Sequence, residues 1–274
     1  MKDRRLAASG LAALVQGDSG PRVLALHGWL DNAGSFCPMA PWLEGCQLVC
    51  LDFPGHGQSP HRPEGLVYHF DDYLFDVLAA ADELGWKTFH LLGHSLGGAV
   101  SSLIAAACPD RVLSLSLIEG LGPMSAAASK TANQWRKAVR ASHSRPRRTH
   151  PDRDSAIAAR ARGSDLDQSM ARTLAERGLI SVEGGYQWGH DQRLTWPTGH
   201  YYTEPQVLDL LAAIEAPVLN LYSDPPSGIL PRQLLIQRVS ALARQRLHAL
   251  PGGHHLHMRY PRETAALVLE HINA

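Results

Sequence analysis

Short apolar runs alternate with longer amphipathic stretches through most of the chain. Six short runs, each bounded by Gly, Pro or Asp, predict buried strands at 22–28, 46–53, 87–95, 111–120, 216–224 and 244–252. Apolar residues at helical spacing predict helices at 36–45, 69–85, 96–109, 229–243 and 262–273. Two further short strands are expected near the N-terminus, turning at 9–10. Strands that alternate with helices indicate an α/β fold with a mostly parallel sheet and helices on both faces.

The segment 123–203 breaks this alternation. It contains helical stretches at 131–143, 153–162 and 166–178, followed by "YQWGHDQRLTWPTGHYY", which is dense in aromatic side chains and histidine. We therefore predict a core built from 1–122 and 204–274, with 123–203 forming a helical cap. Such a cap would cover the carboxyl edge of the sheet, where ligands of open α/β sheets bind.

Composition narrows the classes of partner. The chain has 274 residues, of which 45% are hydrophobic, and its 26 basic residues balance its 26 acidic ones. We expect neither a nucleic-acid partner nor a membrane span, because there is no basic excess and no apolar run of about 20 residues. Four cysteines are too few for a disulfide scaffold, which favours reduced thiols and a cytoplasmic protein. A monomer or a homodimer is expected.

The strongest local motif is "LLGHSLGGAV" at 91–100. It holds the pattern G-x-S-x-G around Ser95, directly after a predicted strand and before a predicted helix. Flanking glycines permit the strained turn that presents such a serine as a nucleophile. The dipole of the following helix favours negative charge at its N-terminus. An ordinary glycine-rich turn is the alternative, and the strand and helix on either side make it the weaker one.

Two other loops supply candidate partners for Ser95. "LPGGHHLHM" at 250–258 follows the last predicted strand, where this architecture places the general base, and we select His254. His255 and His257 are expected to pack or to orient the loop, and a metal site at this pair is disfavoured because no acidic or cysteine cluster accompanies it. "LALHGWLDNAGSF" at 24–36 offers the backbone N–H of Trp29, which together with that of Leu96 would form an oxyanion hole.

Together these motifs resemble the α/β-hydrolase superfamily. "LHGWLDNAGSF", "LDFPGHGQS", "LLGHSLGGAV", "DQRLTWP" and "PGGHHLHM" further resemble the subgroup called serine hydrolase-like proteins, and they run from about residue 20 to about residue 260. The resemblance implies an eight-stranded, mostly parallel sheet with a helical cap after the sixth strand. It also implies Ser95 as nucleophile, His254 as base, and Trp29 and Leu96 as oxyanion-hole donors.

The sequence offers two candidates for the acidic member of the triad. Many α/β hydrolases carry it shortly after the seventh strand, where this chain reads "VLNLYSDPPSGIL" and offers only Asp224, at the strand end. Glu119 ends the sixth strand, a position that some haloalkane dehalogenases use for their acid. We favour Glu119, with Asp224 as the alternative. Each residue also has a purely structural interpretation. The Glu119 carboxylate would accept hydrogen bonds from backbone N–H groups and so stabilise the hinge of the cap, and Asp224 would form the turn before Pro225.

These observations predict a serine hydrolase that cleaves a carboxylic ester of a small molecule through an acyl-enzyme, with no metal or organic cofactor. Trp29, Tyr186, Trp188 and Trp196 are candidate substrate contacts, although packing within the cap would equally explain the last three. The same triad would also serve C–C bond, lactone or thioester hydrolysis, or lyase chemistry. A non-catalytic ligand-binding protein is a further alternative, which the retained serine and histidine disfavour.

Overall fold

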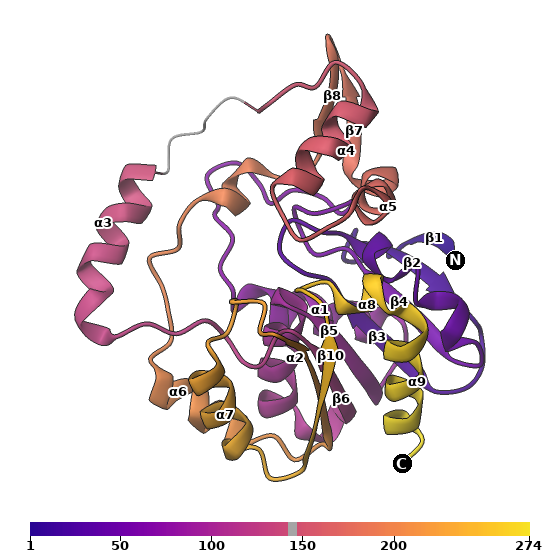
Figure 1. Cartoon of the computed structure of the whole chain (residues 1–274), viewed down its shortest axis with the longest axis vertical. Coiled ribbons are helices and arrows are strands. Elements are labelled where there is room, and N and C mark those ends of the chain that lie inside the picture. The colour runs from indigo at the N-terminus through magenta and orange to yellow at the C-terminus, as the bar shows by residue number, and fades with distance from the viewer. Residues whose placement is uncertain (142–146) are drawn as a thin grey trace.

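An eight-stranded sheet forms the centre of the computed structural model, which describes residues 1–141 and 147–274 (Figure 1). The strand order is β1-β2-β4-β3-β5-β6-β9-β10. β2 pairs antiparallel with both of its neighbours and the remaining pairs are parallel, so the predicted mostly parallel sheet is confirmed. The strands are β1 Lys2–Arg5, β2 Ala12–Gln16, β3 Arg22–Leu26, β4 Gln47–Leu51, β5 Phe89–His94, β6 Val112–Ile118, β9 Val218–Asp224 and β10 Gln245–Pro251.

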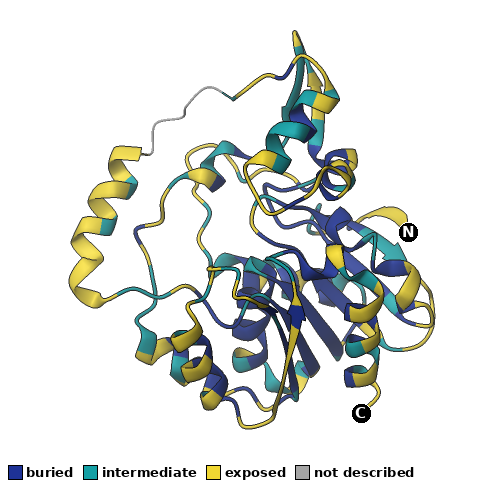
Figure 2. Cartoon of the chain, viewed as in Figure 1, coloured by how far each residue is buried: buried dark blue, intermediate teal, exposed yellow. Residues whose placement is uncertain are grey.

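Helices cover the two faces of this sheet and bury its central strands (Figure 2). One hydrophobic cluster joins the sheet to α1, α2, α6 and α7, and a second joins it to α9, α8 and two short 3₁₀ turns, η1 and η2. Burial of both faces explains why the central strands read as nearly continuous apolar runs. The helices are α1 Asp72–Glu83, α2 Leu96–Ala107, α6 Glu204–Ala212, α7 Arg232–Ala241, α8 Leu256–Arg259 and α9 Pro261–Ile272.

The prediction of an α-helix at 36–45 is wrong. The chain instead makes two 3₁₀ turns, η1 Ala33–Phe36 and η2 Ala40–Leu43. Pro38 and Pro41 lack the backbone N–H that an α-helix needs, so they limit this stretch to short turns. Further 3₁₀ turns are η3 Pro109–Arg111, η4 Ala128–Lys130 and η5 Gln192–Thr195.

The 123–203 segment contains three helices, α3 Thr131–Ala141, α4 Arg153–Arg162 and α5 Gln168–Gly178. Positions 142 and 143 of the predicted 131–143 helix lie outside the described residues. The segment also contains two short strands that the sequence pattern did not predict, β7 Leu179–Val182 and β8 Gly185–Trp188, which form a hairpin. Gly184 and Gly185 both have positive φ, which permits the tight turn between these strands.

The 123–203 segment is divided in space (Figure 1). Helix α3 lies apart from α4, α5 and the hairpin, and it has no buried residue. Helices α4 and α5 share a small hydrophobic cluster with Met258 of α8, so this part of the segment is packed against the core near the last predicted motif. Along residues 1–141 and 147–274, no helix combines the length and apolarity needed to cross a bilayer.

Candidate active site

Ser95 occupies a strained turn between β5 and α2. Its backbone has φ 52° and ψ −114°, and residues other than glycine seldom adopt a positive φ. Neighbouring chain segments approach so closely that a Cβ at Gly97 would lie 1.9 Å from the carbonyl oxygen of Leu26. The glycines of the motif are therefore required by packing, and the turn places the half-buried Ser95 immediately before α2.

Glu119 adopts a second strained conformation, directly after β6. Its φ is 52°, and its backbone N–H donates to the carbonyl of Leu221 on β9 at 2.9 Å. The next residue, Gly120, passes so near the nucleophile turn that a Cβ there would lie 2.3 Å from the Ser95 carbonyl oxygen. The end of β6 is thus held against both β9 and the turn that carries Ser95.

The carboxylate of Glu119 lies beside His254. The Nδ1 atom of His254 is 3.5 Å from Oε2 of Glu119, and the glutamate side chain is only 7% exposed. Asp224 is exposed at the end of β9, and its carboxylate has no hydrogen bond or ion pair to any residue in 1–141 or 147–274. The structure therefore brings His254 together with Glu119 and leaves Asp224 apart from both.

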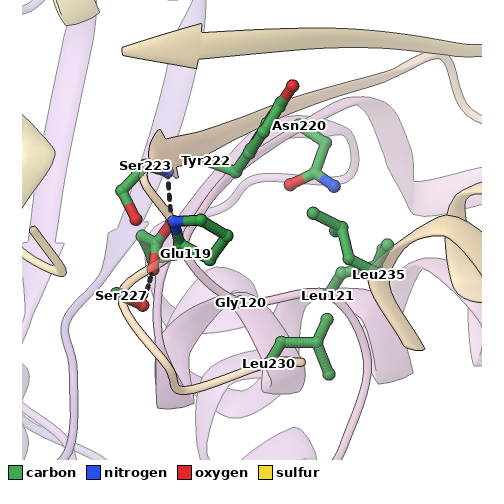
Figure 3. A pocket seen from close by; sticks show the side chains of 10 residues that line it. Glu119, Gly120, Leu121, Asn220, Tyr222, Ser223, Ser227, Leu230 and Leu235 are labelled. Atoms are coloured by element: carbon green, nitrogen blue, oxygen red, sulfur yellow. Dashed lines mark hydrogen bonds between the residues drawn. The ribbon is translucent and has the colours of Figure 1, made fainter. Parts of the chain in front are cut away.

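The end of β9 and the loop after it supply further donors to Glu119 (Figure 3). The Ser223 backbone N–H and the Ser227 hydroxyl donate to the two carboxylate oxygens. Burial alone would raise the pKa of Glu119, but the hydrogen bonds from His254, Ser227 and Ser223 outweigh it and lower that pKa. The adjoining cavity, about 20 Å³ and lined by Glu119, Asn220 and Ser227 among others, has room for one water molecule and not for a substrate.

The hydroxyl of Ser95 and the imidazole of His254 make no hydrogen bond to each other, nor does the hydroxyl bond to any other residue that the structure describes. The loop after β10 that carries His254, called the histidine loop below, is held by a different contact. The Nε2–H of His94, the residue before Ser95, donates to the carbonyl of His254 at 3.0 Å. The predicted nucleophile and base are therefore carried by segments that are hydrogen-bonded to one another.

The two predicted oxyanion donors have free backbone N–H groups among the described residues. Leu96 is the first residue of α2, where an N–H has no partner within the helix. Trp29 follows β3, and its backbone N–H has no hydrogen-bond partner in the described part of the chain. Its indole N–H donates to the carbonyl of Leu194 in η5 at 2.9 Å, which ties this loop to the 123–203 segment.

The predicted aromatic contacts are not all in one place. Trp188 and Trp196 both line a cavity of about 610 Å³ with Arg140 and His190. Tyr186 is absent from the described lining of that cavity and instead lies under the guanidinium of Arg153. Binding of substrate by Trp29, Tyr186, Trp188 and Trp196 stays a prediction.

An ionic cluster that the sequence did not single out, with Asp31 and His255 buried at its centre, lies next to the base. The ring of His255 is placed between two carboxylates, with Nδ1 2.6 Å from Asp165 Oδ1 and Nε2 3.2 Å from Asp31 Oδ2. Arg160 completes the cluster through a 2.8 Å contact to the other oxygen of Asp31. The histidine was visible in the "GGHHLH" motif, but its partners were not, because they are 224 and 90 residues away.

Asp31, His94 and His255 also form a group whose ligand atoms lie within 4.8 Å of one another, the spacing of a possible metal site. Both ring nitrogens of His255, however, already face carboxylate oxygens that can only accept hydrogen bonds. A protonated His255 satisfies both carboxylates, so the cluster is explained as an ion-pair network.

Comparisons with known proteins agree with this architecture. Residues 21–259 match the model of the family described as alpha/beta hydrolase fold. A serine hydrolase-like protein of Dictyostelium discoideum is 30% identical over 269 residues, which cover 92% of this chain and 75% of the relative.

Two solved structures are similar over essentially the whole chain. A hypothetical protein from Pseudomonas aeruginosa PAO1 has 38% identity and a TM-score of 0.91, covering 100% of this chain and 99% of the other. A thioesterase domain from the curacin biosynthetic pathway has 25% identity and a TM-score of 0.86, covering 98% and 99% of the two chains.

Proposed function

Because this chain belongs to the α/β hydrolase fold family, we propose that it is a serine hydrolase that cleaves a carboxylic ester of a small molecule. Ser95 would be the nucleophile, His254 the general base and Glu119 the acid that orients His254. The observation that carries the proposal is the strained Ser95 turn at the start of α2, with a buried carboxylate and an imidazole on the two loops beside it. This combination supports activation of a serine and stabilisation of an imidazolium.

In the proposed reaction, His254 Nε2 removes the Ser95 proton as Oγ attacks the ester carbonyl carbon. The resulting oxyanion would be held by the backbone N–H groups of Trp29 and Leu96, supported by the dipole of α2. Collapse of the tetrahedral intermediate breaks the C–O bond, and His254 gives its proton to the departing alcohol. Water, deprotonated by His254, then attacks the acyl-enzyme and releases the carboxylic acid and free Ser95.

We further propose that 123–203 acts as a cap. Its support is the contact between Trp29 and Leu194, together with the ionic contacts of Arg160 and Asp165 to loops beside the site. Trp188 and Trp196, which line a cavity within this segment, would then contact the acyl or alcohol part of the substrate.

Thioester hydrolysis is a second candidate for the same residues. It is favoured by the similarity of nearly the whole chain to the thioesterase domain of the curacin pathway at 25% identity. An acyl-enzyme on Ser95 serves both reactions, and only the leaving group differs.

A fluorophosphonate probe, which labels activated serines, tests the proposal. Wild type should be labelled and Ser95→Ala should not. Turnover of p-nitrophenyl esters and of matched acyl thioesters, each over a series of acyl lengths, then separates the two candidates by their kcat/KM. Failure of wild type to react with the probe and with both substrate series would reject the hydrolase proposal.

A further inference from the structure

The loop that carries His254 is held by an unusual arrangement at the next residue, His255. This side chain is buried, with 7% exposure, and each of its ring nitrogens faces a carboxylate. A neutral imidazole would present a lone pair to one of these oxygens, whereas an imidazolium donates to both. Asp31 and His255 are buried, whereas Asp165 and Arg160 are partly exposed. With His255 and Arg160 positive and Asp31 and Asp165 negative, the four side chains carry no net charge, which makes the burial of Asp31 and His255 tolerable.

The four groups come from different parts of the molecule. Asp31 closes the turn that contains Trp29, since its backbone N–H donates to the Gly28 carbonyl at 3.1 Å. Arg160 is on α4, and Asp165 is in the loop between α4 and α5, both within 123–203. The backbone N–H of His255 also donates to Asp165, at 3.1 Å.

The glycine before His254 leaves room for the contact between Asp165 and the histidine loop. A Cβ at Gly253 would lie 2.6 Å from Asp165 Oδ2, so the glycine permits the close approach of the aspartate. The other charged or titratable groups around the His255 ring are the imidazoles of His94, His254 and His257, with ring centroids 4.9, 5.3 and 6.3 Å away. Burial lowers the pKa values of His94 and His257, so neither competes for the positive charge.

We propose that His255 is a positioning residue, whose imidazolium bridges Asp31 and Asp165 and thereby fixes the base loop against both the Trp29 turn and the 123–203 segment. The inference rests on the proposed function of Ser95, His254 and Glu119. It adds that the base and the oxyanion donor are placed through one shared ionic bridge, which forms only when the α4–α5 region is docked. Loss of the bridge would displace His254 without removing any reacting group.

The pH dependence of the bridge follows from its carboxylates. Burial would lower the pKa of His255, but Asp165 and Asp31 outweigh this effect and raise it to about 9. The bridge is therefore intact at neutral pH and is lost as the pH rises through about 9. Removing one carboxylate should move that loss to lower pH.

The test measures kcat and KM for a p-nitrophenyl ester from pH 6 to 10, expressed per active site counted with the fluorophosphonate probe. The variants are Asp165→Asn, whose side chain is 34% exposed and so tolerates the change, and His255→Gln. We expect His255→Gln to lower kcat by about 10²-fold with a smaller change in KM, since a small misplacement of a catalytic group costs this much. Asp165→Asn should move the alkaline decline of kcat to lower pH.

Arg172→Gln is the matched control, because it breaks an exposed ion pair with Asp154 within the same segment and does not touch the bridge. It should leave kcat and the alkaline limb unchanged. Normal kcat per labelled site and an unmoved limb in both test variants would overturn the positioning role while leaving the proposed function in place. A loss of thermal stability alone, with normal kcat, would also overturn it. Absence of labelling in wild type would overturn both proposals.

Discussion

The Nδ1 atom of His254 lies 3.5 Å from the Oε2 atom of Glu119, although 135 residues separate them in the chain. The order of strands explains the contact, since β6, β9 and β10 are neighbours and run parallel. Glu119 follows the first of these strands and His254 the last, so both lie at one edge of the sheet. Asp224 ends the strand between them, yet its side chain is exposed.

Replacement of the glutamate should therefore affect turnover far more than replacement of the aspartate. We expect Glu119→Gln to lower kcat by about 10³ to 10⁴-fold, because the amide no longer stabilises the imidazolium, and Asp224→Asn to remain near wild type. Steady-state kinetics on a p-nitrophenyl ester measures both. The reverse ranking would assign the acid to Asp224.

The hydroxyl of Ser227 should help to keep the pKa of Glu119 low. Ser227→Ala removes one donor to the carboxylate and should raise the pKa of Glu119. The proposed mechanism requires the ionised form of Glu119, so the acidic limb of the pH profile of kcat/KM should move to higher pH, and kcat at neutral pH should fall about tenfold. Ser240→Ala removes an exposed serine of α7 that bonds only within its helix, and it should leave the profile unchanged. An unmoved acidic limb in Ser227→Ala would contradict this role.

The sequence carried enough information for most of the core and for part of the site. Ser95 was predictable because its turn is a local feature, in which glycines, strand and helix follow one another within about ten residues. Glu119 was predictable as a candidate because a carboxylate ending a buried strand is costly without a partner. The choice between Glu119 and Asp224 depended on side-chain direction, which strand periodicity does not determine.

Other features depended on contacts between distant residues. The β7–β8 hairpin was missed because each of its strands has only four residues, which is too short for a period-two pattern to be distinguished from its surroundings. The cluster of Asp31, Asp165 and Arg160 around His255 was missed for a different reason. Charged residues in loops or on a polar helix normally signify solvent exposure, and only the folded chain brings these side chains together around His255.

Arg177 should be important for stability. Its Nε donates to the fully buried Asp52 at 2.7 Å, which joins α5 to the loop after β4, and Asp52 also accepts from the backbone N–H groups of Ala33 and Gln58. Arg177→Ala leaves this carboxylate without its cation, so we expect a loss of about 3 to 5 kcal/mol in the free energy of unfolding. Urea denaturation measures the loss, and Arg172→Ala, at an exposed pair, should cost much less. Equal costs for the two variants would show that Asp52 is satisfied by its backbone donors.

The charge on His255 should also make the stability of the fold depend on pH. The pKa of His255 is about 9 in the folded protein, because of Asp165 and Asp31, and near 6.5 in the unfolded chain. Its contribution is therefore complete below about pH 6.5 and is lost as the pH rises through about 9, with a total of about 3 kcal/mol. Urea denaturation between pH 6 and 10 should give a steeper alkaline decline for wild type than for His255→Gln. His200→Gln, which changes an exposed histidine 3.7 Å from Asp71, should follow the wild-type curve. Parallel curves for wild type and His255→Gln would mean that this imidazole is not the charged partner of the two aspartates.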